Sequence, residues 1–441
     1  MVAPLKAGVA GLGTVGAAVV RLLGQQRELI AARCGRSIEV TAVSARSAGK
    51  SRDLGGATPR FVADPVTLAG DDEIDVFVEL MGGDGDPAKS AIEIALSAGK
   101  AVVTANKALL ARYGVELAVL AEKHGVPLNY EAAVGGAIPI IRTLREGFGV
   151  NPLTRVSGIL NGTCNYILTR MEQDKLSFTE CLKDAQRLGY AEADPTFDVE
   201  GFDTAQKLAI MASLAFGIRV NPAAVYVEGI SSITPEDLDA ADALGYRVKL
   251  LGVAVRTAQG IEQRVHPTMV PKESAIAQVM GVTNAASFDS EGAAPITLVG
   301  PGAGGMATAA SVVADLGDIA SGLRTAVFGR PAGALAECPQ APMQRHEGGY
   351  YIRLAAVDRP GTFAAIAKWL AGEGISLESI MQRHPGDRPR GGDDPTSPAA
   401  PAPVILITYA TTEDAIYRAL AAIKDEGVIA GQPQVIRIEK D

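Results

Sequence analysis

The chain has 441 residues, of which 47% are hydrophobic and 21% are charged, and its formal net charge is −9. This length predicts two or three domains, and this composition is that of an ordinary soluble globular protein. The acidic balance argues against nucleic acid and against an anionic membrane as partners, although it identifies no substrate.

The cysteines and the N-terminus bear on where the protein works. The four cysteines are scattered without CxxC spacing, which favours a reducing compartment over a disulfide framework or a cysteine metal site. The expected first strand follows Met1–Lys6 at once and leaves no room for the apolar region of a signal peptide. No apolar run approaches the roughly 18 residues of a membrane span. We therefore expect a cytoplasmic protein.

Residues 1–131 alternate short apolar strands with helical stretches such as Val15–Leu23 and Lys89–Ala98. This alternation is typical of parallel βαβ units and predicts an α/β domain. The expected strands are Ala7–Ala10, Glu39–Ser44, Val76–Leu80, Ala101–Thr104 and Leu128–Tyr130.

The sequence GLGTVG lies between the first strand and the first helix of this domain. In a dinucleotide site, Gly11 permits the tight turn, Gly13 lets the backbone approach the pyrophosphate, and Gly16 lets helix and strand pack closely. The first helical amides, at Thr14 and Val15, then face the phosphates. A tight turn without a ligand is the alternative. The context favours a Rossmann-type domain.

The end of the second strand bears on the choice between NAD and NADP. An acidic residue there usually binds the ribose 2′-hydroxyl of NAD. This chain instead has Ser44, Arg46 and Lys50 and no acid. The basic loop favours NADP, with NAD still possible; the alternative is that Arg46 and Lys50 are merely solvated.

Residues 132–300 read as a mixed α+β substrate domain. Ser177 with Glu180 forms a capping box, and Thr234 caps a short helix that begins at a proline. The other elements expected here are the helices Ile138–Glu146 and Phe202–Phe216 and the strands Arg155–Leu160, Tyr246–Arg256 and Glu262–Val270.

The segment AEADPTFDVEGFDTAQK places five carboxylates within twelve positions, from Glu192 to Asp203, before Lys207. Asp203 and Lys207 share one helix face at a spacing of four residues. An ordinary helix salt bridge is the alternative, but apolar neighbours predict a mostly buried helix. A lysine held near carboxylates and a cofactor can donate or accept a proton, and Glu192 or Asp198 would suit a substrate ammonium.

Two further segments offer polar groups near the expected cofactor. Lys107 follows a buried strand at its carboxyl end, where open α/β sheets bind ligands. EAAVGGAIPI, from Glu131 to Ile140, offers a carboxylate and a turn of carbonyls, the ligands that hard cations prefer. A glycine turn before a helix is the more ordinary interpretation of the second segment.

The last third of the chain begins with a second glycine-rich turn, GPGAGG, which leads into a helix and returns the chain at about 300–330 to the first domain. Residues 350–441 then predict strand, helix, two strands, helix and strand, a ferredoxin-like βαββαβ domain. Between its central strands, the proline-rich segment 385–403 is interpreted as a disordered insert.

Six motifs occur in the order found in homoserine dehydrogenases: GLGTVG, ANKALLA around Lys107, EAAVGGAIPII, GILNGTCNYIL, AEADPTFDVEGFDTAQKLAI and GPGAG. The chain resembles this family over essentially its whole length. With no kinase-like segment before the dinucleotide-binding region, the monofunctional bacterial type is expected. The C-terminal unit, with its DRPG turn, resembles an ACT domain.

The resemblance implies reversible NAD(P)H-dependent reduction of L-aspartate 4-semialdehyde to L-homoserine, in threonine, methionine and isoleucine biosynthesis. It implies that Lys207 is the proton donor and acceptor and that Lys107 contacts cofactor and substrate. Glu192 and Asp203 would bind homoserine with Asp198 nearby, and Gly302 or Gly304 would touch the nicotinamide side of the cofactor.

The resemblance also implies a cation and an effector. Glu131, with the carbonyls of Val134, Gly136 and Ile138, would match the family's monovalent cation site, for which Na⁺ is expected. The ACT-like domain implies feedback regulation by L-threonine and a homodimer or homotetramer. The long insert departs from the family pattern and puts regulation in more doubt than catalysis.

Two other functions remain open at this point. One is another NADP-dependent reductase of a small carbonyl compound or amino acid. The other is a non-catalytic regulator that binds NADP and an amino acid, against which Lys107, Asp203 and Lys207 argue. Activity on homoserine, compared with other amino and hydroxy acids, separates them.

Overall fold

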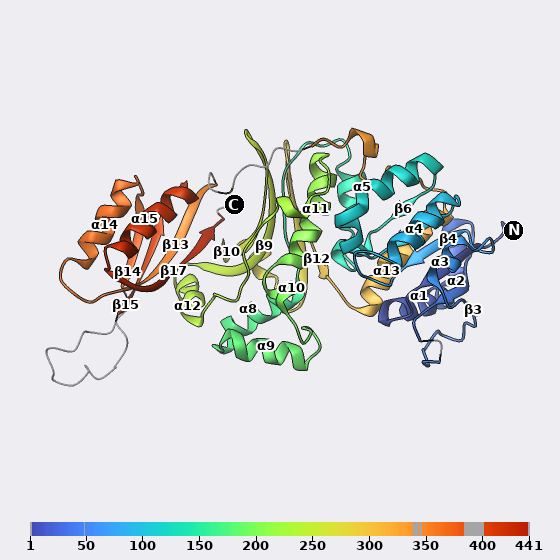
Figure 1. Ribbon diagram of the computed structural model, residues 1–441, viewed down its shortest axis with the longest axis horizontal. Coiled ribbons are helices and arrows are strands. Elements are labelled where there is room, and N and C mark those ends of the chain that lie inside the picture. The colour runs from blue at the N-terminus through green and yellow to red at the C-terminus, as the bar shows by residue number, and fades with distance from the viewer. Residues whose placement is uncertain (1, 48, 338–342, 344–345, 383–400, 440–441) are drawn as a thin grey trace.

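The computed structural model describes residues 2–47, 49–337, 343, 346–382 and 401–439. These residues form an elongated molecule with three regions in a row (Figure 1). The N-terminal region lies at one end, the C-terminal βαββαβ unit lies at the other, and a large sheet with its helices lies between them. Within the described ranges, no helix is both long enough and apolar enough to cross a membrane.

The N-terminal region is a sheet of six parallel strands. Its spatial order is β3 (Arg60–Phe61), β2 (Ile38–Ser44), β1 (Leu5–Ala10), β4 (Val76–Glu79), β5 (Ala101–Thr104) and β6 (Leu128–Asn129). The strand order reverses between β1 and β4, and such a switch point opens a crevice at the carboxyl ends of the strands. The predicted Rossmann-like sheet is confirmed, and β3 is the strand that the sequence pattern missed.

Helices cover both faces of this sheet and bury its apolar strands. One face carries α1 (Thr14–Gln25), α2 (Arg27–Cys34) and α13 (Gly305–Ala320), and the other carries α3 (Pro65–Gly70), α4 (Ala88–Ser97) and α5 (Lys107–His124). The helix α13 comes from late in the chain and packs against α1. The predicted return of the chain to the first region is therefore present in the structure.

The central and C-terminal regions share one continuous sheet of eleven strands. Nine of them follow each other in space as β12 (Ala293–Pro301), β11 (Thr283–Ser290), β7 (Leu153–Ile159), β9 (Tyr246–Thr257), β10 (Gly260–Pro271), β17 (Ile429–Ile438), β13 (Glu347–Ala356), β15 (Ala402–Thr408) and β14 (Leu377–Gln382). The short strands β8 (Tyr226–Val227) and β16 (Thr411–Thr412) pair with β10 and β13. The predicted long pair, β9 and β10, is confirmed as an antiparallel ladder.

The helices of the central region are α6 (Ala132–Gly135), α7 (Ile140–Arg142), α8 (Gly162–Asp174), α9 (Phe178–Arg187), α10 (Thr196–Val199), α11 (Phe202–Phe216) and α12 (Pro235–Ala243). Among them, α8, α11 and α12 pack against the strands of the large sheet, and the others pack mainly on neighbouring helices. The predicted capping box at Ser177 and the predicted cap at Thr234 are both present. The helix expected over Ile138–Glu146 begins later, because Ile138 closes the preceding turn, and it continues as a π-helical turn over Thr143–Gly147.

The C-terminal region has the predicted βαββαβ order, with α14 (Thr362–Gly372) and α15 (Glu413–Asp425) on one face of its four strands. The opposite face contributes Tyr351, Ile407 and Ile436 to the main core of the molecule. Most of the expected insert, 385–403, lies outside the described residues. Its end is placed wrongly by the prediction, because Ala402 and Pro403 belong to β15 and pair with β13.

Candidate active site

The glycine turn after β1 has the backbone geometry that its sequence predicts. Gly11 has φ +99° and lies against the end of β4, where a side chain would collide with the backbone of Leu80. A side chain at Gly16 would collide with the carbonyl of Gly11. Nothing lies within 4 Å of the Cβ position of Gly13, so the first turn of α1 faces open space. These residues fit a dinucleotide phosphate at the helix N-terminus.

The loop after β2 is basic, and hydrogen bonds tie it to the glycine turn. Ser44 is buried at the end of β2, and its carbonyl accepts a hydrogen bond from the amide of Gly11. Arg52 donates to the carbonyls of Leu12 and Lys50 at 2.8 Å each, which ties the loop to the glycine turn. Arg46 is exposed. The basic stretch 44–50, which has no acid, thus follows directly on the strand end that bonds to the glycine turn.

The second glycine turn lies beside the first. Gly304 has φ +117° and precedes α13, and a side chain at Gly305 would stand 2.7 Å from Cγ2 of Thr14. Gly302 faces Gly136, where a side chain would stand 2.5 Å from the Gly302 carbonyl group. The structure therefore brings three segments predicted to form the site to one place: 11–16, 131–138 and 300–305.

A buried ion cluster joins α5 and α11, two helices that pack together. Lys207 Nζ donates to Asp203 Oδ2 at 2.8 Å and to the carbonyl of Leu160 at 2.7 Å. Lys107 Nζ lies 3.1 Å from Asp203 Oδ1. Asp203 is 5% exposed. The spacing of four residues predicted the first ion pair, but no sequence pattern indicated that one carboxylate holds both lysines.

Asn161 connects this cluster to the loop before α11. Its Nδ2 donates to Asp198 Oδ1 and to Asp203 Oδ2 at 2.9 Å each, while its Oδ1 accepts from the amide of Cys164 and caps α8. The motif GILNGTCNYIL contains this asparagine, but nothing in the sequence indicated its bonds to the two aspartates. Glu192 lies exposed in the same loop, and only its backbone carbonyl is fixed, by Gln186.

The two aspartates are shifted in opposite directions. Burial alone would raise the pKa of the Asp203 carboxyl, but the charges of Lys207 and Lys107 hold that pKa well below its usual range. Burial and then the neighbouring charge of Asp203 raise the pKa of the Asp198 carboxyl. Opposed shifts of this kind are typical of active sites. Both Asp203 oxygens are engaged by protein groups, Oδ1 by Lys107 and Oδ2 by Lys207 and Asn161.

Lys107 is positioned by a second buried carboxylate that sequence analysis missed. Glu79 ends β4 and is fully buried, and it accepts hydrogen bonds from the hydroxyl of Thr104 and the amide of Met81 at 2.7 Å each. Asn106 caps α5 and donates to the carbonyl of Gly83 at 2.8 Å. These bonds fix the carboxyl ends of β4 and β5 and the start of the helix that carries Lys107.

The segment proposed for a cation is already densely bonded. Both oxygens of Glu131 accept amide hydrogen bonds, from Ile141 at 2.8 Å and Arg142 at 2.9 Å. The Gly136 carbonyl accepts from Ser311, and the Ile138 carbonyl accepts from Ile140. Among the described residues, no group of three or more acidic, histidine or cysteine side chains suits a metal ion. The arrangement does not favour a cation, and the site at Glu131, Val134, Gly136 and Ile138 stays a prediction.

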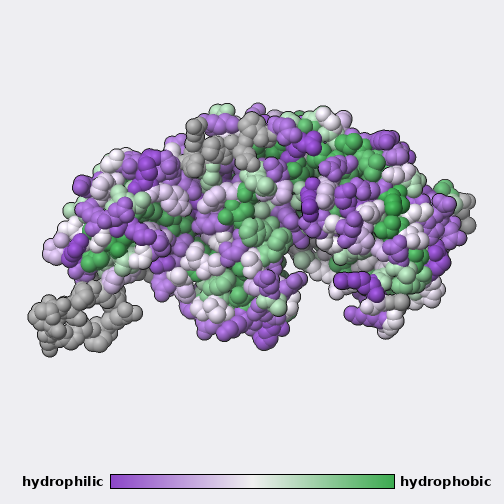
Figure 2. Space-filling model, viewed as in Figure 1, coloured by the Kyte–Doolittle hydropathy of each residue, from purple (hydrophilic) through white to green (hydrophobic). Residues whose placement is uncertain are grey.

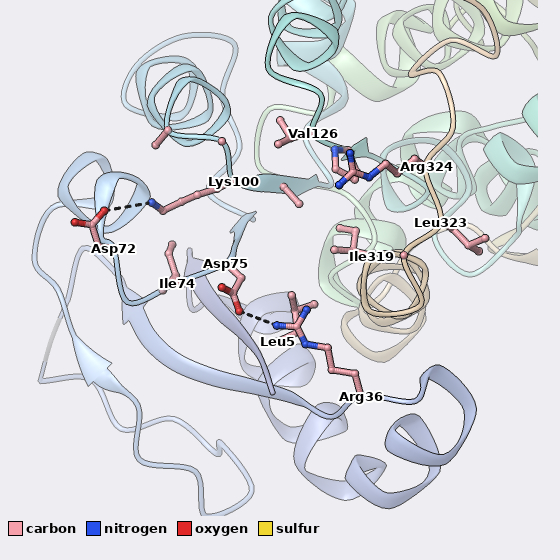
Figure 3. A pocket seen from close by; sticks show the side chains of 15 residues that line it. Leu5, Arg36, Asp72, Ile74, Asp75, Lys100, Val126, Ile319, Leu323 and Arg324 are labelled. Atoms are coloured by element: carbon pink, nitrogen blue, oxygen red, sulfur yellow. Dashed lines mark hydrogen bonds and ion pairs between the residues drawn. The ribbon is translucent and has the colours of Figure 1, made fainter. Parts of the chain in front are cut away.

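A cavity of about 400 Å³ lies at the opposite, amino-end edge of the six-stranded sheet (Figure 3). Its charged groups serve the fold: Arg36 bonds to Asp75, and Arg324 donates to the carbonyl of Gly125. Ligands of open α/β sheets bind at the carboxyl ends of the strands. We therefore place the site at the other edge, toward the indentation between the N-terminal region and the central region in Figure 2.

Comparison with known proteins decides the family. The family model for the homoserine dehydrogenase NAD-binding domain matches residues 11–131, and the homoserine dehydrogenase model matches residues 139–316. The chain is 43% identical to homoserine dehydrogenase of Pseudomonas aeruginosa and 42% identical to that of Neisseria gonorrhoeae, over 99% of each chain. The chain belongs to the homoserine dehydrogenase family.

The homoserine dehydrogenase family also accounts for the fold as a whole. The crystal structure of a homoserine dehydrogenase from Thiobacillus denitrificans is similar with a TM-score of 0.91 and 41% identity, covering 99% of this chain and 98% of that one. The predicted family is therefore confirmed, and the protein is an NAD(P)-dependent oxidoreductase. The other reductase and the non-catalytic regulator are set aside.

Proposed function

We propose that this homoserine dehydrogenase interconverts L-aspartate 4-semialdehyde and L-homoserine with Lys207 as proton donor and acceptor. The observation that carries the proposal is the cluster in which Asp203 holds Lys207 and Lys107. A nicotinamide cofactor, when bound, supplies or accepts the hydride. Lys207, whose Nζ is fixed by two hydrogen bonds, gives its proton to the oxygen of the aldehyde and stabilises the charge that develops there.

The surrounding residues have supporting roles in this proposal. Lys107 lies at the start of α5, next to Asp203, and would contact both cofactor and substrate. Asp198 and Glu192 lie in the loop before α11, and we propose them as partners of the homoserine ammonium, together with Asp203. Gly302 and Gly304 lie in the turn beside the GLGTVG segment and would border the nicotinamide.

The reaction itself is tested by the absorbance of reduced nicotinamide with purified protein, NADP⁺ and L-homoserine at alkaline pH. A rise that depends on homoserine would establish the reaction. If NADPH binds but homoserine gives no rise, the proposed substrate is wrong.

We propose NADP as the preferred cofactor because the loop after β2 is basic. Arg46 is exposed two residues after the end of β2, and Asp53, the first acid of this loop, is paired with Arg21 at 2.9 Å. We expect Arg46→Ala to raise KM for NADPH by about tenfold and to leave KM for NADH nearly unchanged, because only NADPH carries the 2′-phosphate. Lys123→Ala, on a distant part of α5, is the control. An equal change for both cofactors would contradict the preference.

We propose that the C-terminal region is an ACT-type regulatory domain that responds to L-threonine. Its strand order, β17-β13-β15-β14 with two helices on one face, supports this fold. In initial-rate measurements on the full-length enzyme, we expect L-threonine to inhibit the reaction and D-threonine to have no effect. By resemblance, effectors bind between paired copies of this domain, so a homodimer or homotetramer is expected. A mass of 45.6 kDa in light scattering would contradict the homodimer or homotetramer.

A further inference from the structure

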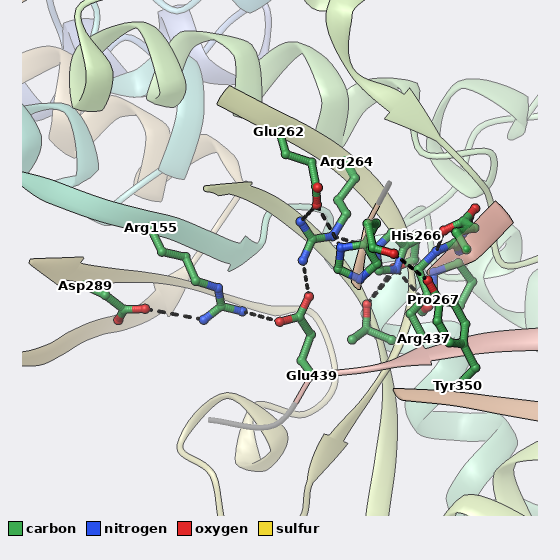
Figure 4. A network of polar contacts seen from close by, with 12 residues as sticks. Arg155, Glu262, Arg264, His266, Pro267, Asp289, Tyr350, Arg437 and Glu439 are labelled. Atoms are coloured by element: carbon green, nitrogen blue, oxygen red, sulfur yellow. Dashed lines mark hydrogen bonds and ion pairs between the residues drawn. The ribbon is translucent and has the colours of Figure 1, made fainter. Parts of the chain in front are cut away.

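Arg437 of β17 is a buried cation that joins the C-terminal region to the central region. It is 1% exposed and belongs to the polar network drawn in Figure 4. Nε and Nη2 donate to Glu413 of α15 at 2.8 and 2.6 Å, and Nη1 donates to Glu228 at 2.7 Å. Nη2 also donates to the hydroxyl of Tyr226 at 3.2 Å. The side chain therefore fixes Glu228 from across the boundary between the two regions.

Glu228 lies at the start of a segment that packs directly on the turn 198–203, which precedes and begins α11. Its amide donates to the carbonyl of Val265 in β10 at 2.8 Å. A side chain at the next residue, Gly229, would stand 2.5 Å from the carbonyl oxygen of Val199. The amide of Ile230 donates to that same carbonyl at 2.9 Å. The backbone of residues 228–230 is thus in direct contact with residues 199–200.

Residues 198–201 in turn set the start of the helix that carries the ion cluster. Asp198 accepts the hydrogen bond from Asn161, and Gly201, with φ +87°, is the N-terminal cap of α11. A side chain at Gly201 would stand 3.0 Å from Val265 and 3.2 Å from Val227. Because this turn has no free space on the side of β8 and β10, a shift of residues 228–230 must move it.

A gain in stability alone does not explain why the ion pair of Arg437 and Glu228 is buried. A buried ion pair is often no more stable than a well-packed apolar pair, and its best-supported benefit is a fixed geometry. The regions are joined elsewhere as well: Arg264 of β10 pairs with Glu439, and Arg353 of β13 pairs with Asp237 of α12 at 2.7 Å. Of these three cations, Arg437 is the one whose partner, Glu228, begins the segment that contacts the turn 198–203.

We propose that Arg437 is a positioning residue for the reaction, which acts through Glu228 on the substrate-binding turn 198–203. This inference rests on the proposed placement of the substrate near Asp198, Asp203 and Lys207. The C-terminal region is then part of the structure that shapes the active site, rather than only an attached domain.

The test measures KM for L-homoserine, KM for NADP⁺ and kcat in full-length variants. We expect Arg437→Met and Glu228→Gln each to raise KM for homoserine by about two- to thirty-fold, the range of such couplings. KM for NADP⁺ should change much less, because the glycine turns 11–16 and 300–305 lie outside the turn 198–203. The double variant should be no worse than the worse single variant, since both remove one connection.

Arg353→Met is the matched control, because Arg353 is also a long cation of the C-terminal sheet that pairs with a central carboxylate. An equal rise in the homoserine KM of Arg353→Met would show general loosening and overturn the proposal. An unchanged KM for homoserine in Glu228→Gln would also overturn the proposal. Because glutamine has nearly the same shape as glutamate, this variant still provides the test if Arg437→Met does not fold. Lys207→Ala is measured in the same experiment. Full turnover in Lys207→Ala would refute both the proposed site and this inference. An inactive Lys207→Ala, together with Arg437 and Glu228 variants that behave like the wild type, would refute this inference alone.

Discussion

Replacing Lys207 by alanine is expected to lower kcat by a factor of roughly 10² or more, the typical contribution of a positioned general acid or base. Lys207 is the residue of the cluster that has both an acidic partner, Asp203, and a backbone partner, the carbonyl of Leu160. Its ammonium is therefore held in one direction. KM for the cofactor should change little, since the glycine turns are untouched. Steady-state kinetics with both substrates varied measures this effect.

Two further variants separate proton transfer from charge. Lys207→Arg keeps the positive charge, but a guanidinium does not give up its proton at neutral pH, so it should stay nearly as slow as the alanine variant. Lys183→Ala, on the exposed face of α9, should keep full activity. An unchanged turnover number in Lys207→Ala would remove Lys207 from the chemistry, and strong activity in Lys207→Arg would leave it only an electrostatic role.

Asp203→Asn is expected to lower both stability and activity, because it leaves two lysines beside a neutral side chain in a buried site. Breaking a buried ion pair by removing one partner costs about 3 to 5 kcal/mol of unfolding free energy. Activity should fall with it, since neither Lys107 nor Lys207 keeps its anchor. Urea unfolding and steady-state kinetics of the same preparation measure the two losses.

The pH dependence of this stability loss has a defined sign. The pKa of Asp203 in the folded protein lies well below its ordinary value of 3.8. Its ionised form therefore contributes stability above pH 3.8, and that contribution is lost as the pH falls further toward the folded pKa. The difference in unfolding free energy between wild type and Asp203→Asn should be largest near pH 7 and shrink below pH 3.8. A difference that does not depend on pH would contradict the ion cluster.

Periodicity and capping residues were enough to predict most individual elements. The helix Phe202–Phe216 was expected with the bounds that it has, because an apolar stripe and a closing glycine mark both of its ends. The helix Arg27–Cys34 was missed because Ile30 is its one buried residue, so it has no apolar stripe to detect. The strand Arg60–Phe61 was missed because it is two residues long and exposed.

What the sequence could not predict are the contacts between residues far apart in the chain. Asn161 belongs to the motif GILNGTCNYIL, but its bonds to Asp198 and Asp203 reach 37 and 42 residues along the chain. Glu79 is a lone acid at the end of a strand and belongs to no motif. The pairing of β17 with β10 joins two regions that were expected to be separate, and no local pattern specifies which strand edges meet.

The place of β17 in the large sheet has a consequence for synthesis in the cell. β17 is made after β10 and β13, yet it lies between them in the sheet. Until it arrives, β10 and β13 each expose an open strand edge, and open edges promote pairing with other chains. These two edges can therefore close only after residues 429–438 have been made. A stop codon placed just before residue 429 should yield aggregated protein rather than a shortened active enzyme.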